Sequence, residues 1–310
     1  MFHENFCYKS AFFLLNIHFL YAIMNTLSYQ DSERTLRSLH IFIIYFPAKG
    51  TLMRADKFLF EKGLAKSRSH AAALIKDGVR IGNKRIEKAS QDIPDDTPSC
   101  DIKIENPSKY VSRGGVKLEA AIFSFKPEIA GKTALDLGAS TGGFTDCLLQ
   151  NGAQRVYAVD VGHGQLDPSL QNDPRVISLE GTNARSLTPN TTGEVCDIAV
   201  SDLSFISQAL IYPAVRANIK DGGIFISLIK PQFEAGKELI GKGGIVRDRN
   251  IHVKIIESLF EKAANEGLFP EALIPSPIEG GDGNREYLAL FRIGEERAFT
   301  PSDIKKIVFS

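Results

Sequence analysis

A glycine-rich stretch behind a short apolar run carries the residue types of a nucleotide-holding loop. It reads Thr-Ala-Leu-Asp-Leu-Gly-Ala-Ser-Thr-Gly-Gly-Phe from 133 to 144. Glycines let the backbone pass close to a ligand, and a helix that follows can offer free N–H groups. Ser140 replaces the second glycine of a dinucleotide fingerprint, so an adenosine-type ligand without a pyrophosphate is favoured over a plain tight turn. The candidate contacts are Asp136, Gly138, Ser140, Thr141, Gly142, Gly143 and Phe144.

A second apolar run, 155 to 159, ends in another acid, Asp160. Asp160 lies 24 positions after Asp136, close to where a ribose-binding acid stands in nucleotide-binding sheets. It is therefore a candidate acceptor for both ribose hydroxyls, and the alternative is a structural acid that caps the turn before Gly162. Asn183 is a candidate contact for the adenine edge, although a turn-forming asparagine explains it nearly as well.

Charged residues also stand at the ends of predicted strands further along the chain. Asp202 and Lys230 end apolar runs, Glu286 begins one, and Lys117 lies in a predicted helix before the first strand. The carboxyl ends of parallel strands meet at one edge of a sheet, so these charges can converge there. Each of them alone could equally form an ordinary surface ion pair.

The elements that must position these residues follow from the alternation of apolar runs with helix-length segments. Helices are expected at 144–150, 208–218 and 250–266, and strands at 133–138, 155–160, 176–180, 197–202, 223–230 and 286–292. This order predicts a doubly wound α/β sheet whose ligand site lies at the carboxyl ends of the strands.

The composition is that of a soluble globular protein with room for two domains. The chain has 310 residues, 43% hydrophobic content and no net charge, although 54 to 88 holds ten Lys or Arg against four Asp or Glu. A basic module therefore accompanies a neutral to acidic remainder. The four cysteines lack C-x-x-C spacing, so we expect neither a zinc site nor disulfides, and no metal. The cytoplasm is the simplest compartment.

Residues 1 to 52 differ from the rest of the chain in character. Their apolar run, 10 to 24, is too short to span a bilayer and contains Asn16 and His18. We expect an extension outside the functional unit, and the alternatives are a membrane-surface anchor or a secretory signal.

A small, orderly segment begins at Met53. Its pattern predicts a short helix ended by Gly63, a second helix after Ser67 and a hairpin that turns at Gly82 and Asn83. We expect this domain with its linker to occupy 53 to 107, and a second domain to occupy 108 to 310.

Residues 53 to 93 resemble the RNA-binding domain named after ribosomal protein S-four. The matching motifs are Arg-x-Asp at 54–56, Leu-Ala-x-Ser-Arg at 64–68 and Gly-Val-x-Ile-x-Asn at 78–83. In that domain the second helix and the hairpin face the phosphate backbone, and a solvated basic face is the alternative. The candidate RNA contacts are Arg54, Lys66, Arg68, His70, Lys76, Arg80, Lys84 and Arg85, with Arg113 at the start of the second domain.

Five motifs of the larger domain resemble, in order, the hemolysin A/TlyA family of ribosomal RNA methyltransferases, whose catalytic domain is of the FtsJ type. They are Ser-Arg-Gly-Gly-Val-Lys-Leu from 112, Asp-Leu-Gly-Ala-Ser-Thr-Gly-Gly-Phe-Thr from 136, Ser-Asp-Leu-Ser-Phe-Ile-Ser from 201, Leu-Ile-Lys-Pro-Gln-Phe-Glu from 228 and Gly-Asn-Arg-Glu-Tyr from 283. The departures are the N-terminal extension and Val116. The combined expectation is an α/β fold, a Rossmann-like sheet with a small α+β RNA-binding domain on its N-terminal side.

The resemblance implies S-adenosyl-L-methionine as donor and 2′-O-methylation of a ribose, with cytidine the usual target, in ribosomal RNA or ribosomal subunits. The family's Lys-Asp-Lys-Glu tetrad falls on Lys117, Asp202, Lys230 and Glu286. We expect Lys230 to steer or deprotonate the 2′-hydroxyl, the two acids to hold the lysines and Lys117 to supply a second cation.

Two other classes of function stay open at this point. The haemolysin name and the apolar start suggest a membrane-active protein, but nothing after residue 50 has a membrane-length apolar run, and we expect no stable membrane association. A non-catalytic ribosome-binding factor could keep the fold, but a pure binder has no need of the tetrad.

Overall fold

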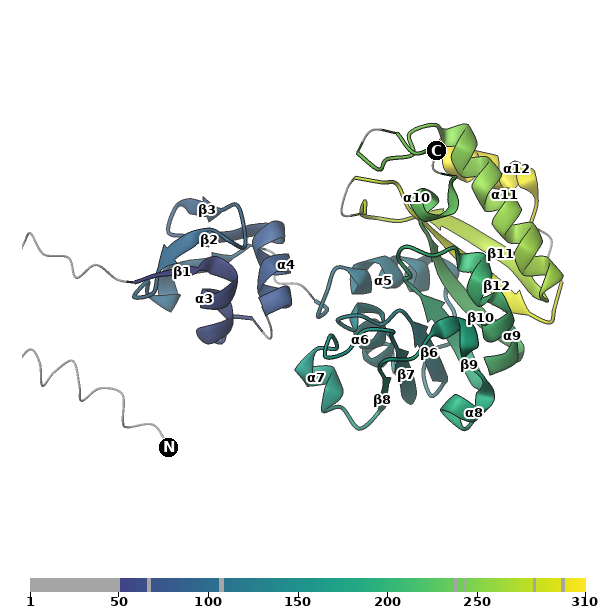
Figure 1. Ribbon diagram of the computed structural model, residues 1–310, viewed down its shortest axis with the longest axis horizontal. Coiled ribbons are helices and arrows are strands. Elements are labelled where there is room, and N and C mark those ends of the chain that lie inside the picture. The colour runs from purple at the N-terminus through teal and green to yellow at the C-terminus, as the bar shows by residue number, and fades with distance from the viewer. Residues whose placement is uncertain are drawn as a thin grey trace, which may run out of the picture. The chain divides into compact units, whose positions relative to one another are not determined.

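The computed structural model describes residues 51–65, 68–105, 109–236, 239–241, 243–280, 283–296 and 299–310 (Figure 1). The expected N-terminal extension lies outside these residues up to position 50, and so does Lys66. The domain boundaries and the role of the extension therefore stay predictions.

The small domain contains the expected two helices and hairpin. Helices α3 (Ala55–Glu61) and α4 (Arg68–Gly78) precede β2 (Val79–Ile81) and β3 (Lys84–Ile86), which pair antiparallel. Gly82 has a φ of 55° in the turn between them, a conformation that glycine adopts without strain. The remaining elements are β1 (Leu52–Arg54), β4 (Asp92–Pro94), η1 (Ser99–Asp101) and β5 (Ile102–Ile104). Buried Phe58, Leu59 and Leu74 form the core with the hairpin.

The large domain is built on a seven-stranded sheet in the order β11-β12-β10-β9-β6-β7-β8. The strands are β6 (Thr133–Leu137), β7 (Arg155–Val159), β8 (Val176–Leu179), β9 (Cys196–Ser201), β10 (Ile219–Ile229), β11 (Leu268–Pro275) and β12 (Tyr287–Ile293). The five strands from β10 to β8 pair parallel, and β12 is antiparallel to both of its neighbours. The expected doubly wound α/β fold is confirmed.

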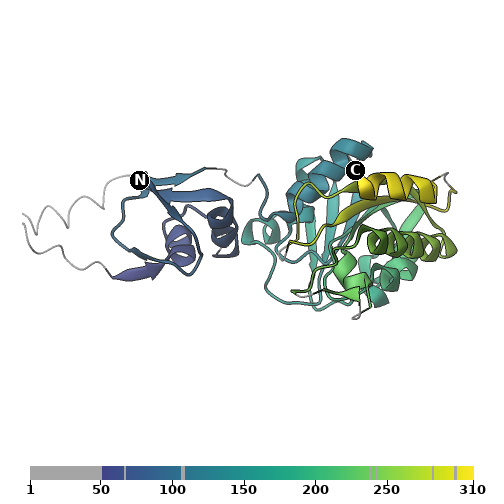
Figure 2. The same cartoon turned by 90° about the horizontal axis from the view of Figure 1, so that it is seen from above.

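Helices cover both faces of this sheet (Figures 1 and 2). One face packs against α5 (Gly114–Phe125), α6 (Gly143–Gln150) and α7 (Pro168–Gln171), and the other against α9 (Tyr212–Asn218), α11 (Arg249–Asn265) and α12 (Pro301–Phe309). Because both faces are buried, the central strands consist mostly of apolar residues. Short helical segments complete the chain at η2 (Ala184–Ser186), α8 (Pro189–Thr192), η3 (Gln208–Ile211) and α10 (Pro231–Glu234).

The chain reverses its direction of travel across the sheet beside β6. It proceeds outward from β6 through β7 to β8, and then returns to β9 on the other side of β6. In open α/β sheets such a switch point leaves a crevice at the carboxyl ends of the two central strands. The glycine-rich loop after β6 and the segment after β9 therefore meet there.

The structure corrects three expectations about elements. Strand β10 begins at Ile219 rather than at Gly223, and its pairing with β9 shifts register between Ile219 and Ile224, where Gly222 has a φ of 73°. Strand β11 is not among the expected strands; it contains Pro270 and Pro275, which an edge strand tolerates. The expected helix 208–218 divides into η3 and α9.

No helix of the described residues is both long and apolar enough to cross a membrane.

Candidate active site

The glycine-rich loop after β6 passes close to the segment after β9. A Cβ added at Gly138 would lie 3.0 Å from the Asp202 carbonyl oxygen and 2.8 Å from a methyl carbon of Leu203. Gly138 also has a φ of 84°, and Ser140 adopts a left-handed φ of 48°. Only a residue without a side chain fits this first position, which explains the glycine.

Asp160 fixes the same loop from the end of β7. Its carboxylate accepts hydrogen bonds from the Ser140 amide at 2.8 Å and from the Gly162 amide at 2.7 Å. Each oxygen keeps a second lone pair for a ligand. The structural and ligand-binding interpretations of Asp160 are therefore compatible.

A pocket of about 440 Å³ opens between the loop, the end of β7 and the segment after β9. We call it the larger pocket. Of the predicted contacts, Gly138, Ser140, Asp160 and Asn183 line it. Other residues that line it are not among the candidate contacts, although the last four belong to the motif that begins at Ser201: Thr182, Arg185, Leu203, Ser204, Phe205 and Ile206.

A smaller pocket of about 170 Å³ adjoins the larger one, because Gly138, Ser140, Asp202 and Ser204 line both. The predicted contacts Thr141, Gly143 and Phe144 line only the smaller pocket. Lys230 lines it too, together with Ser112 and Gly114 at the start of α5.

Lys230 is nearly buried, with 8% of its surface exposed. Its ammonium lies 2.6 Å from Oδ1 of Asp202 and donates a hydrogen bond to the Ser204 hydroxyl at 2.8 Å. It also lies 5.7 Å from the centre of the Phe233 ring. A buried charge needs such compensation, and the acid after β9 provides it.

Lys117 and Glu286 form a second, more deeply buried ion pair. The Lys117 ammonium lies 2.5 Å from Oε2 of Glu286, and the two side chains are 10% and 2% exposed. Lys117 belongs to α5, and Glu286 directly precedes β12. The four charges proposed from sequence thus form two lysine–acid pairs.

Two predicted contacts, Asp136 and Gly142, line neither pocket. Asp136 is fully buried and accepts a hydrogen bond from the Thr145 hydroxyl at 2.7 Å. Burial, and to a lesser degree the charge of Asp202, raises its pKa to about 7. A Cβ at Gly142 would lie 2.2 Å from a methyl carbon of Leu170. Both residues contact the elements behind the loop, and their predicted contacts with a ligand stay predictions.

Comparison with known proteins agrees with this geometry. Residues 110–293 match the model of the FtsJ-like methyltransferase family, and residues 53–95 match the S4 domain. The first match covers more than half of the chain.

The chain belongs to the FtsJ-like methyltransferase family.

Individual relatives of this methyltransferase extend over most of its length. It is 41% identical to the 16S/23S rRNA (cytidine-2′-O)-methyltransferase TlyA of Mycobacterium tuberculosis, over 82% of this chain and 95% of that one. It is also 41% identical to hemolysin A of Brachyspira hyodysenteriae, over 78% of this chain and 100% of that one. A solved structure from Streptococcus thermophilus superposes with a TM-score of 0.67 at 41% identity, over 83% of this chain and 94% of that one.

Several basic residues of the methyltransferase's S4 domain form hydrogen bonds within the domain. Arg54 and Arg68 both donate to buried Asp56, which lowers the pKa of that carboxyl to about 2. Arg80 donates to Glu105 at 2.6 Å, and His70 is buried, which does not fit a contact with RNA.

A hollow of about 560 Å³ on the S4 domain is lined by several basic residues. Lys76, Arg85 and Lys88 line it together with Arg54. All three are exposed, as is Lys84 in the hairpin. Arg113, at the start of the methyltransferase domain, donates to the Glu279 carbonyl at 3.3 Å.

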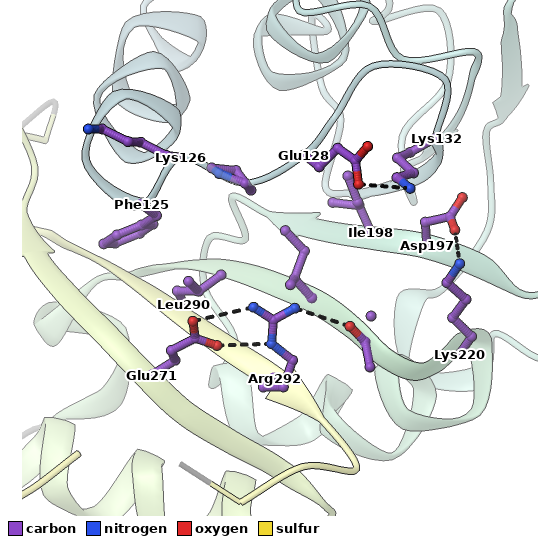
Figure 3. A pocket seen from close by; sticks show the side chains of 14 residues that line it. Phe125, Lys126, Glu128, Lys132, Asp197, Ile198, Lys220, Glu271, Leu290 and Arg292 are labelled. Atoms are coloured by element: carbon purple, nitrogen blue, oxygen red, sulfur yellow. Dashed lines mark hydrogen bonds and ion pairs between the residues drawn. The ribbon is translucent and has the colours of Figure 1, made fainter. Parts of the chain in front are cut away.

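A further hollow of about 360 Å³ lies at the other end of the parallel strands, where β6, β9 and β10 begin. Figure 3 shows the side chains that line it. Three of its cationic side chains are paired with acids of the same hollow: Lys132 with Glu128, Lys220 with Asp197 and Arg292 with Glu271. These three ion pairs offset one another's charge. The pairs Lys230–Asp202 and Lys117–Glu286 lie at the carboxyl ends of the parallel strands instead.

Proposed function

We propose that the chain transfers a methyl group from S-adenosylmethionine to the 2′-hydroxyl of a cytidine ribose in ribosomal RNA. The FtsJ-like family assignment supports methyl transfer, and the S4 domain supports binding to RNA. The name of the Mycobacterium tuberculosis relative supports cytidine and ribosomal RNA as the target. The enzyme would act in the cytoplasm, on ribosomal RNA or ribosomal subunits.

The larger pocket suits the donor in size and chemistry. Its volume of about 440 Å³ lies within the usual range for small-molecule pockets, about 300–1,000 Å³. Asp160 would accept from the ribose hydroxyls, Asn183 would face the adenine edge, and Gly138 and Ser140 would hold the amino-acid end. When bound, S-adenosylmethionine supplies a methyl group on a sulfonium, which needs little further activation.

The smaller pocket is the proposed place of the acceptor ribose. Lys230 lines it and would orient the 2′-hydroxyl as an ammonium, or take its proton as the neutral amine. Asp202 and Ser204 hold the ammonium in place, so the lysine has little freedom to turn away. Lys117, held by Glu286, would add a second positive charge near the same rim.

One observation carries this proposal. Asp202 and Ser204 line both pockets, and both contact the Lys230 ammonium. The group that would handle the acceptor proton therefore lies where the two pockets adjoin. Holding two reactants in such a geometry is one of the tasks that this reaction requires of a protein.

The test is methyl transfer by the purified full chain. Ribosomal subunits from a strain that lacks the gene are incubated with labelled S-adenosylmethionine, and 2′-O-methyl positions are mapped in both ribosomal RNAs. We expect label on a cytidine ribose. Label on a base, or none on RNA although the donor binds, contradicts the proposal.

A further inference from the structure

A buried amide bridges the strand ends that carry Asp202 and Lys230. Gln208 is 2% exposed, its Oε1 accepts from the Ser201 hydroxyl at 2.9 Å, and its Nε2 donates to the Leu228 carbonyl at 3.1 Å. Because a carbonyl can only accept, the Leu228 contact fixes which end of the amide points there. Ser201 directly precedes Asp202, and Leu228 stands two residues before Lys230.

This bridge lies where the backbone pairing of the two strands ends. The last registered pair between β9 and β10 is Ser201 with Ser227. Beyond it, in the part of the chain that the structure describes, no β9–β10 ladder pair sets the separation of the two segments, and Asp202 and Lys230 both lie in that region. The Gln208 side chain is thus the final link between the strands before the ion pair.

Glu234 binds the far end of the loop 202–208, which follows β9. Its carboxylate accepts from the backbone N–H of Gln208 at 2.8 Å and from the Ser207 hydroxyl at 2.6 Å. It belongs to α10, one helical turn after Lys230. Between these contacts the ring centres of Phe205 and Phe233 lie 5.0 Å apart. The loop 202–208 is therefore fastened to the segment 228–234 at both ends and in the middle.

We propose that Gln208 and Glu234 are positioning residues that hold the loop 202–207 against Lys230. Neither residue lines either pocket, so both act through Asp202 and Ser204, which do. This inference rests on the proposed function, because it assigns Lys230 and Asp202 to the reaction. Satisfied buried networks of this kind rigidify a unique arrangement, and a broken one leaves a buried group without its partner.

The test compares two nearly isosteric variants with matched controls. Gln208→Glu places an oxygen against the Leu228 carbonyl, and Glu234→Gln replaces one of two acceptors by a donor. Gln154→Glu and Glu261→Gln make the same changes at exposed positions. Single-turnover methyl transfer is measured on ribosomal subunits at saturating donor and RNA, with the melting temperature of each chain.

We expect both variants to lose about ten- to a hundredfold in transfer rate, because small misplacements at a reacting centre cost that much. The controls should match the parent. In Gln208→Glu, acidification should raise the rate relative to the parent, since the protonated acid can donate to Leu228 again. Parent-like rates in both folded variants overturn the inference.

Hydrogen exchange of residues 202–208 in the ligand-free chain provides a readout without transfer. It should accelerate in both variants, and unchanged exchange overturns the inference. If Gln208→Glu does not fold, Ser207→Ala removes the hydroxyl bond to Glu234 together with the bond that this hydroxyl accepts from the Ala209 backbone N–H, and it should show the same local change. A parent that binds donor but transfers nothing refutes the proposed function instead. The exchange result then still tests whether Gln208 and Glu234 hold the loop in place.

Discussion

The Lys230 ammonium lies 2.6 Å from the Asp202 carboxylate, and the two residues directly follow neighbouring parallel strands. Lys230 is 8% exposed, so its side chain contacts little solvent. An ammonium in such a place is oriented by its partners rather than by solvent. The methyl transfer should depend on it more than on any exposed lysine.

Changing Lys230 to Met should reduce single-turnover methyl transfer at least about a hundredfold, because general-base help alone is worth about 10² to 10⁴. Methionine keeps most of the apolar stem, so donor binding should remain. Lys220→Met is the matched control, since Lys220 pairs with Asp197 at the other end of the parallel strands. A rate within threefold of the parent would move the role to Lys117.

Asp160→Asn should weaken S-adenosylmethionine binding while leaving RNA affinity unchanged. A hydrogen bond to a charged group contributes about 1.5–3 kcal/mol, and asparagine keeps one acceptor for the loop amides. Calorimetry on the variant measures this loss, with Asp221→Asn, an exposed residue paired with Arg216, as control. Equal donor affinity in both variants would leave Asp160 with its structural role alone.

Replacing Lys76 and Lys88 by Gln should weaken RNA binding and flatten its salt dependence. Both are exposed and line the basic hollow of the S4 domain. Removing one lysine–phosphate interaction should lower the salt slope by about 0.7 to 0.9. The control pair, Lys305→Gln with Lys306→Gln, is exposed on α12 and removes the same charge. If both double variants give the parental salt slope, the lysines of the hollow face solvent and do not contact RNA phosphates.

Asp56→Asn should destabilise the S4 domain at pH 7 and much less at pH 2. The Arg54 and Arg68 side chains lower the pKa of Asp56 to about 2, from 3.8. A lowered acid pKa adds stability above about pH 4 that is lost as the pH falls toward 2. The expected loss at pH 7 is about 2 kcal/mol. Urea unfolding followed through the amide resonances of α3 tests it, with exposed Glu61→Gln as control. An equal loss at both pH values would assign the effect to packing.

The sequence by itself determined the order of elements and most of the glycine-rich loop. Apolar periodicity and turn chemistry are local properties, so the strands from β6 to β9, the helix α11 and the hairpin at Gly82 could be predicted from neighbouring residues. Strand β11 escaped prediction because its prolines argue against a strand unless it is known to lie at an edge.

Only the tertiary structure decided which charges pair. Lys117 and Glu286 are 169 positions apart, and no local pattern tells which acid a lysine will meet. From the sequence, Arg54 and Arg68 are candidate RNA contacts, yet both side chains donate hydrogen bonds to Asp56. The Gln208 bridge likewise needs β9 and β10 side by side before its two partners exist. Partners of this kind are set by the order of strands in the sheet, because a buried polar group bonds to whatever the fold brings within reach.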